Sequence, residues 1–395
     1  MTIKLTTAKI ENFKSLGDIS LSFRDLTMIV GSNSSGKSNS LESLNFFKHL
    51  LVSDSLSLET IQTLVRLGKE KINLKLIVED DERNQAEYNV CLKTNKKNVR
   101  IATEILKVNE HEVIKVINGE GEVRDEDGQN SQPYKSDPES IESLALRSAG
   151  NFGNKPFTKK LASYIRDWKF YNIDPDDIRK YSLFMERVKL IKTTEDNDRI
   201  PNLDNEASEI QEVLNYWAKN DRNRINDITQ ELQSCLNISL NLVGKKDPMV
   251  NVLELDGKQM PLSGMSDGTL RLIAYLTLLY QSDSDMPSLI GIEEPEMNFH
   301  PGILKDVASI MKRLSKRTQV VLTTHSSQLL DCFSPEEISS DISIILLSQK
   351  GELGTRACLL DQLAENRDDL SDWMNDFGIG SAIYHSHLIE GILAS

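Results

Sequence analysis

The chain of 395 residues lacks several features that would place it in other classes of protein. It has no apolar run of about eighteen residues, which excludes a transmembrane helix and a membrane location. Its first residues enter an alternating pattern and lack the apolar stretch of a signal peptide. Its cysteines form no CxxC pair, so we expect reduced thiols, no zinc site and a cytoplasmic location. The four cysteines are Cys91, Cys235, Cys332 and Cys358.

An excess of basic residues is also missing. The chain has 46 Lys and Arg against 60 Asp and Glu, and its formal net charge is −14. This charge argues against binding nucleic acid through overall basicity, although a local basic stripe could still do so. We interpret the Lys-rich stretches Lys93 to Lys97 and Lys312 to Arg317 as solvated faces.

Internal repeats and sustained heptads are absent too, which excludes a long coiled coil. Residues 3–30 predict strands, of which Leu26 to Val30 is a buried one. Alternation over residues 73–117 predicts an antiparallel sheet. Residues 240–350 alternate between strand and helix patterns, as expected for a mostly parallel sheet covered by helices.

Three segments of the middle region have a different character. Gly119 to Ser140 is acidic and poor in apolar residues, and we predict a mobile loop there. A second polar loop is predicted over Lys192 to Asn205. The apolar spacing over residues 206–236 fits two helices or one long bent helix.

The sequence between the buried strand and a helix pattern matches the phosphate-binding P-loop, GxxxxGKS. It reads Gly31-Ser32-Asn33-Ser34-Ser35-Gly36-Lys37-Ser38. A chain of this length would match the pattern by chance in about one or two cases per hundred. Glycines let backbone N–H groups close around phosphate oxygens, and the helix start adds a positive field. Lys37 is expected to contact the β- and γ-phosphates and Ser38 to bind Mg²⁺.

A second apolar strand pattern, beginning at Ser288, ends in two adjacent carboxylates, Glu293 and Glu294. We assign Glu293 to Mg²⁺ and its water shell, and Glu294 to polarising the water that attacks the γ-phosphate. Adjacent acids also end many strands as solvated residues. The P-loop in the same chain favours the catalytic interpretation.

His325 follows a third apolar strand pattern, and ligands of open α/β sheets bind at such carboxyl ends. We therefore expect His325 to contact the γ-phosphate, although a lone histidine is more often structural. The sequence favours such a contact less strongly for His300. His385 and His387 are predicted to be surface residues.

The stretch Ser266-Asp267-Gly268 precedes an apolar helix pattern, with Ser266 as the expected N-cap. It could be an ordinary capped helix. A helix N-terminus also attracts anions. Because Lys37 already accounts for this chain's own nucleotide, a second anion-binding helix start makes sense if it serves the nucleotide of another subunit.

These four stretches, taken in their order along the chain, resemble the ABC-type ATPase heads of RecF, SMC and OLD proteins. They resemble more closely the RecF-like AAA family ATPases of prokaryotic defence systems and mobile islands. Residues 31–38 match Walker A, 266–269 the signature loop (preferred to 262–264), 289–294 Walker B and Thr324-His325 the switch histidine. Asn12 to Ser15 resembles the opening strand motif, and Pro295-Glu296 with His300-Pro301 the PE…HP element.

The sequence departs from the family pattern at two places. Glu293 replaces the commoner aspartate of Walker B, and the signature lacks the second Gly and the Gln of transporters. The Q-loop cannot be assigned beyond a polar residue near Asp174 to Arg179.

The resemblance implies an α/β fold: an ABC-ATPase head with a mostly parallel core sheet, an antiparallel β subdomain and a helical insertion. The expected core comprises residues 1–55 and 240–345. Residues 56–239 are the expected insertion and 346–395 a C-terminal extension.

The resemblance also implies a function. Two copies would form a homodimer around two ATP molecules and Mg²⁺, each ATP lying between Lys37 of one copy and Ser266 of the other. Hydrolysis would control a separate effector, expected to be a nuclease, in bacterial antiviral defence. About 55 residues follow Ser340, too few for the TOPRIM nuclease domain of OLD proteins.

Two other functions are weighed against this one. A RecF- or SMC-like DNA-binding ATPase in DNA repair or maintenance is the alternative, which the net charge of −14 weakens. The long middle region and the signature sequence argue against a transporter ATPase.

Overall fold

The computed structural model divides the chain into two compact units. It describes residues 3–53, 57–95, 98–140, 144–191, 201–243, 249–253, 257–338, 340–365 and 367–385. The first unit comprises Met1–Lys169, Ser288–Gly291 and Gln319–Ser395, and the second comprises Phe170–Pro287 and Ile292–Thr318.

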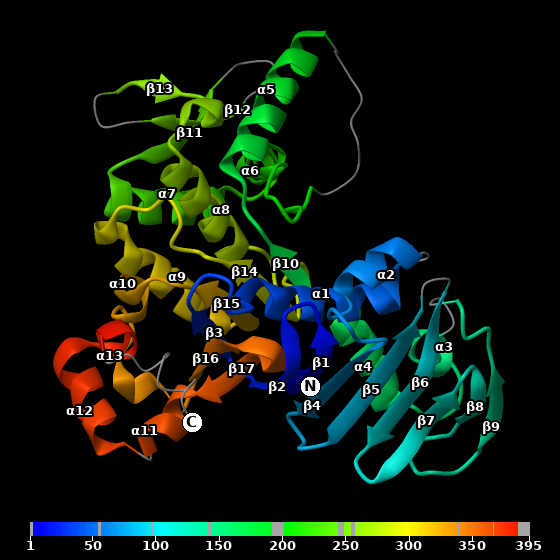
Figure 1. Ribbon diagram of the computed structural model, residues 1–395. Helices are drawn as coiled ribbons and strands as arrows, with labels where there is room; N and C mark the ends of the chain where they lie inside the picture. Colours follow the sequence, from blue (N-terminus) through cyan, green and yellow to red (C-terminus); the bar gives the residue numbers. More distant parts are fainter. Residues whose placement is uncertain are drawn as a thin grey trace. The chain divides into compact units, whose positions relative to one another are not determined.

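A 14-stranded sheet forms the framework of the first unit (Figure 1), and the predicted α/β class is confirmed. Its strand order is β10-β14-β15-β3-β16-β17-β2-β1-β4-β5-β6-β7-β8-β9. The chain passes to the second unit within β10 and β14. The strands are β1 (Ile3–Phe13), β2 (Leu16–Ser22), β3 (Leu26–Gly31), β4 (Lys71–Asp80), β5 (Gln85–Thr94), β6 (Val99–Val108), β7 (His111–Ile117), β8 (Glu120–Val123), β9 (Gln132–Lys135), β10 (Lys169–Tyr171), β14 (Leu289–Glu293), β15 (Gln319–Thr324), β16 (Ile342–Lys350) and β17 (Gly354–Leu359).

The centre of this sheet is parallel, as the sequence predicts. β3 pairs in parallel with both β15 and β16. Every residue of β3 is buried, which is typical of a parallel strand covered on both faces. Thr324 of β15 is in register with Val30 of β3, so the carboxyl ends of both strands lie at one edge of the sheet.

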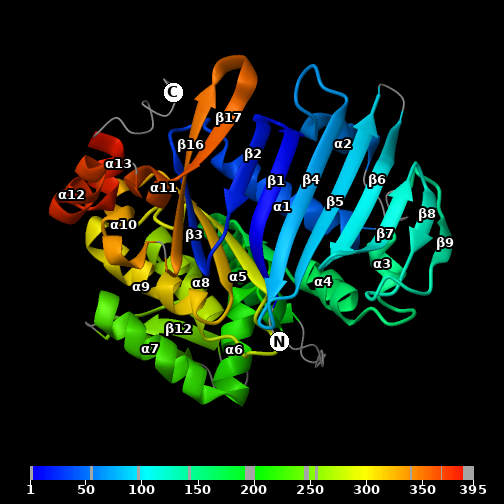
Figure 2. The ribbon, with the colours of Figure 1, turned by 90° about the horizontal axis from the view of Figure 1, so that it is seen from below.

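Strands β4 to β9 continue the sheet in antiparallel fashion (Figure 2). The predicted loop over Gly119 to Ser140 is wrong in part, because β8 and β9 form a hairpin there. Val123 is the one buried side chain in these two strands. The hairpin therefore lacks the apolar alternation by which strands are recognised in a sequence.

Helix α1 follows the P-loop and packs on the sheet through aromatic rings. The ring centroids of Phe13 and Phe46 are 5.8 Å apart, and those of Phe47 and Tyr88 are 5.5 Å apart. The start of α1, and with it the P-loop, is therefore anchored to the core. The helices of the first unit are α1 (Lys37–Val52), α2 (Leu58–Leu64), α3 (Leu146–Ala149), α4 (Pro156–Arg166), α10 (Ser327–Leu330), α11 (Leu360–Glu365), α12 (Asp368–Phe377) and α13 (Ile379–His385).

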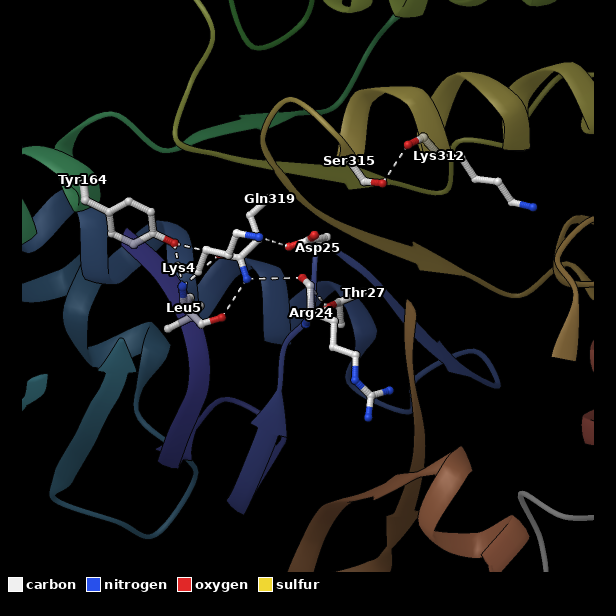
Figure 3. Close-up of polar contacts among 9 residues, drawn as sticks. All are labelled: Lys4, Leu5, Arg24, Asp25, Thr27, Tyr164, Lys312, Ser315 and Gln319. Atoms are coloured by element: carbon white, nitrogen blue, oxygen red, sulfur yellow. Dashed lines mark hydrogen bonds and ion pairs between the residues drawn. The ribbon is translucent and has the colours of Figure 1, made fainter. Parts of the chain in front are cut away.

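Gln319 joins the amino end of β15 to its neighbours in the first unit (Figure 3). Its buried Oε1 accepts hydrogen bonds from the Leu5 amide (2.9 Å) and the Tyr164 hydroxyl (2.8 Å). Its Nε2 donates to the carbonyl oxygens of Leu5 (2.7 Å) and Arg24 (3.2 Å). A fully paired buried amide of this kind fixes one arrangement of the elements around it.

Glu104 places a carboxyl group inside the antiparallel part of the sheet, where its side chain is 1% exposed. Its oxygens accept hydrogen bonds from the Tyr88 hydroxyl (2.9 Å) and from the amides of Ala145 (2.6 Å) and Leu146 (2.9 Å) at the start of α3. Burial raises the pKa of Glu104 to about 7, and the three donated hydrogen bonds oppose that rise.

This shift predicts a pH dependence of stability. The folded pKa exceeds the ordinary value of 4.5, so ionising Glu104 costs free energy in the folded state. Stability contributed by the neutral form is complete below pH 4.5 and is lost as the pH rises through about 7. Between pH 5.5 and pH 8 we expect the free energy of unfolding to fall by about 2 kcal/mol more for the wild type than for Glu104→Gln. Urea unfolding measures both; parallel pH profiles would contradict the assignment.

The second unit is mainly helical and carries a three-stranded antiparallel sheet. Asp221 separates α6 from α7, so residues 206–236 form two helices and not one bent helix. Residues 192–200 of the predicted polar loop lie outside the described residues. No helix in the described ranges is long and apolar enough to cross a bilayer. The elements are α5 (Pro175–Ile191), α6 (Ile210–Asn220), α7 (Arg222–Leu236), β11 (Ser239–Val243), β12 (Met249–Leu253), β13 (Gln259–Met260), α8 (Asp267–Leu279) and α9 (Leu304–Ser315).

Candidate functional site

The predicted P-loop connects the end of β3 to the start of α1. Ser32, Asn33 and Ser34 are exposed at its tip, whereas Ser35 is buried. Gly36 has φ 104°, a left-handed conformation that favours glycine. A Cβ atom there would lie 2.6 Å from the Thr355 hydroxyl oxygen, so the close packing also requires glycine.

Lys37 and Ser38 occupy different environments at the start of α1. The Lys37 side chain is buried, and its Nζ donates to the carbonyl oxygens of Gly31 (3.0 Å) and Ser32 (3.2 Å). The ammonium group therefore lies against the loop that the sequence predicts to hold phosphate. Ser38 is exposed, which suits a hydroxyl ligand of Mg²⁺.

Hydroxyl and amide groups of β17, α1 and Ser15 form a hydrogen-bonded network next to the P-loop. The Thr355 hydroxyl on β17 donates to the Ser35 carbonyl (2.8 Å) and lies 3.3 Å from the Ser15 hydroxyl. Asn39 Nδ2 on α1 donates to the same Ser15 oxygen (2.7 Å). No local pattern in the sequence indicates the role of Thr355, which is 320 residues from Ser35.

His325 directly follows β15, on the edge of the sheet where the P-loop begins. Because Thr324 is in register with Val30, His325 follows at the level of Gly31. Its side chain is exposed. Its neighbour Ser326 caps α10 by accepting a hydrogen bond from the Leu329 amide (3.1 Å). The structure therefore brings His325 and the P-loop to one edge of the first unit.

Glu293 ends β14, the strand next to β15 in the sheet order. Glu294 follows with φ 40°, a left-handed conformation that is uncommon for a residue with a side chain. A turn forms at this point, where the Met297 amide donates to the Glu294 carbonyl (3.1 Å). Both carboxylates are half-buried and both engage other groups. Backbone strain of this kind is concentrated at functional sites.

The predicted signature loop begins α8 in the second unit. Ser266 is its N-cap, as the sequence predicts: the Thr269 amide donates to the Ser266 hydroxyl oxygen (3.3 Å). Asp267 accepts a hydrogen bond from Asn298 Nδ2 (3.2 Å). Gly268 packs so closely that a Cβ atom there would lie 2.8 Å from the Asn298 carbonyl oxygen. The signature loop therefore contacts the segment that follows Glu294.

Arg179 of α5 also binds this loop. Its Nη2 donates to the Met265 carbonyl (2.9 Å) and forms an ion pair with Asp267. Hydrogen bonding to the Asp267 carboxylate raises the pKa of the Arg179 guanidinium above its usual value. The sequence placed Arg179 only within a segment near an unassigned Q-loop, because nothing local indicates a contact 86 residues away.

Three further histidines of the sequence are His300, His385 and His387. His300 Nδ1 accepts a hydrogen bond from the Gly302 amide (3.2 Å) and caps a short 3₁₀ turn. The side chain of His385 and all of His387 lie outside the described residues. Within the described ranges, no group of three or more His, Cys, Asp or Glu residues could hold a metal ion by itself.

Comparison with known proteins shows the family of this chain. The sequence profile of the AAA_21 family, described as "AAA domain, putative AbiEii toxin, Type IV TA system", matches residues 26–331. Comparison with curated proteins found no match. The chain is thus a nucleotide-binding AAA domain by fold and motif. It belongs to the AAA_21 family.

Two solved structures show the same fold at low sequence identity. One is an Smc head bound to the C-winged helix domain of ScpA (TM-score 0.54, 14% identity, covering 91% of this chain and 99% of that chain). The other is an Smc head with an extended coiled coil, bound to the C-terminal domain of ScpA derived from Pyrococcus furiosus (TM-score 0.50, 14% identity, covering 93% and 99%). The fold of this chain is therefore that of an SMC-type ABC-ATPase head.

Proposed function

We propose that the chain binds ATP at residues 31–38 and hydrolyses it with Mg²⁺ in a dimer of two copies. The observation that carries this proposal is the P-loop itself, with the buried Lys37 and the exposed Ser38 at the start of α1. Family membership and the SMC-head fold support it.

Each residue of the proposed site has a separate role in hydrolysis. Backbone N–H groups of residues 31–38 bind phosphate oxygens, and Lys37 leaves its carbonyl partners to contact the β- and γ-phosphates. Glu294 orients and polarises the attacking water, and His325 contacts the γ-phosphate. Ser38 and Glu293 would hold Mg²⁺, which would supply positive charge to offset the charge that develops on the phosphates.

The position of Ser266 supports the proposed dimer. Its side chain is exposed at the N-terminus of a 13-residue helix, where backbone N–H groups attract an anion. The ATP of a second copy would bind there, so that each nucleotide lies between Lys37 of one copy and Ser266 of the other. ATP would hold the two copies together, and hydrolysis would release them.

The proposed consequence is control of a separate effector, expected to be a nuclease in antiviral defence. The family description, which names a putative toxin of a toxin–antitoxin system, supports a role of this kind. Linkage requires the effector to bind the closed and open dimers with different affinities. Co-expression with the product of the neighbouring gene, followed by a pull-down with and without ATP, tests this part. Recovery that is the same under both conditions would contradict it.

A second candidate is an ATP-gated DNA-binding head. A groove of about 510 Å³ at the ends of β4, β5 and β6 favours it, because its described lining residues include three cations, Lys71, Lys93 and Arg100, and one acid, Glu70. ATP-dependent and salt-dependent DNA binding would support this function. An ATP-dependent effector complex without DNA binding would reject it.

The role of His325 predicts a loss of turnover without a loss of binding. We expect His325→Ala to lower kcat for ATP hydrolysis by about 100-fold, because one contact to the charge of the transition state is removed. ATP affinity should stay within about twofold, since His325 is exposed and the P-loop is unchanged. His300→Ala, at another exposed histidine, is the control. Equal turnover in both variants would remove His325 from the site.

A further inference from the structure

The geometry around Ser266 is set by residues outside the signature motif. Among the residues that the structure describes, the Ser266 hydroxyl pairs with Thr269, three positions along the chain (Oγ to Oγ1, 2.9 Å). The residues on either side of it are both held by Arg179: its Nη2 donates to the Met265 carbonyl (2.9 Å) and binds the Asp267 carboxylate. One guanidinium therefore spans Ser266.

Arg179 is itself fixed on α5. Its Nη1 donates to Asp176 Oδ1 (3.0 Å) one turn earlier, and 25% of its side chain is exposed. The planar guanidinium has five N–H donors at fixed angles, so it holds its three acceptors in one rigid arrangement, whereas the three donors of a lysine ammonium rotate freely. Asn298 holds the second oxygen of Asp267. The start of α8 is thereby clamped between α5 and the segment after Glu294.

The contact also has an electrostatic consequence. Asp267 puts a negative charge in the first turn of α8, next to the helix end that is expected to receive a triphosphate. An uncompensated carboxylate at that point would repel the anion. The Arg179 guanidinium compensates it while leaving Ser266 exposed.

We propose that Arg179 is a positioning residue for the composite nucleotide site: it orients Ser266 and neutralises Asp267, so that α8 can accept the ATP of a second copy. This inference rests on the proposed ATP-linked dimer. Through the hydrogen bonds of Arg179, α5 directly contacts the start of α8, although α5 belongs to the middle region and has no motif of its own.

A purely structural ion pair would behave differently. Exposed ion pairs contribute little to global stability, and 46% of the Asp267 side chain is exposed. Arg179→Ala should therefore leave the melting temperature and the ATP affinity of a single copy nearly unchanged. Its effect should fall on dimer formation.

The experiment uses the full chain carrying Glu294→Gln, so that hydrolysis does not obscure binding. Light scattering over a range of protein concentrations gives the dimer dissociation constant in ATP, and calorimetry under dilute conditions gives ATP affinity. We expect Arg179→Ala to raise the dimer dissociation constant on the order of tenfold and Arg179→Lys to raise it less. Lys180→Ala is the matched control, since Lys180 is the next residue on α5 and pairs with Asp177 instead.

Adding Asp267→Asn to Arg179→Ala should recover part of the lost dimerisation, because it removes the uncompensated charge. Failure to recover any of it would contradict the neutralising role. If Arg179→Ala dimerises as tightly as its parent, the inference is overturned and the proposed function stands. If the parent itself does not dimerise in ATP, the proposed function fails and the inference falls with it.

Discussion

Replacing Lys37 with alanine is expected to abolish ATP binding. The ammonium group lies buried against the carbonyl oxygens of Gly31 and Ser32, and it is the cation that the P-loop would bring to the phosphates. Removing it leaves those phosphates without a charge-assisted partner, and we expect ATP affinity to fall by about 100-fold or more. Calorimetry or a filter-binding assay measures this directly.

Lys48→Ala provides the matched control for this variant. Lys48 lies on the same helix, is half-buried, and donates to a backbone carbonyl, that of Trp168. It lies about three turns further along α1 than Lys37, at the end of the helix away from the P-loop. We expect Lys48→Ala to keep wild-type ATP affinity. ATP binding retained by Lys37→Ala would refute the assignment of residues 31–38 as the phosphate site.

Replacing Glu294 with glutamine should stop hydrolysis while preserving ATP binding. Glutamine keeps the size of the side chain but cannot polarise a water molecule as a carboxylate does, so we expect kcat to fall by about 100-fold to 10,000-fold. ATP would then persist between the two copies, and the dimer should accumulate. Phosphate release and light scattering measure the two effects separately.

Combining Glu294→Gln with Lys37→Ala tests whether the accumulated dimer depends on the P-loop. We expect the double variant to stay in the state of the nucleotide-free protein, because no ATP is bound to hold the copies together. A double variant that dimerises in ATP as readily as Glu294→Gln would show that the association has another cause.

The parts of the site that could be predicted from sequence are those encoded by neighbouring residues. Residues 31–38 form one continuous motif between a strand and a helix, and Ser266 caps the helix that follows it. Their local spacing carries the information, so the structure places them as expected. Such short-range patterns depend on backbone geometry and not on the rest of the fold.

The supporting contacts could not be predicted, because they join residues that are distant in sequence. Thr355 reaches Ser35 across 320 positions, and Arg179 reaches Asp267 across 88. A threonine or an arginine in a polar segment gives no local signal of its partner. Only the packing of β17 near the P-loop and of α5 near α8 brings these groups into contact.

The burial of Glu104 was missed for a different reason. Strict alternation along a strand predicts which face each residue occupies. The register between β5 and β6 shifts after Leu92 pairs with Ile101, so that Cys91 pairs with Thr103 and Ala102 is left over. This bulge changes the phase of the alternation and turns Glu104 inward, beside Tyr88.

Two copies of the chain are proposed to close around ATP. The most direct test is the molar mass of Glu294→Gln by light scattering, first without nucleotide and then with ATP and Mg²⁺. We expect a monomer whose mass doubles when ATP is added and returns to that of one chain when ATP is removed. A mass that remains that of one chain in saturating ATP, with ATP binding confirmed in the same sample, would contradict it.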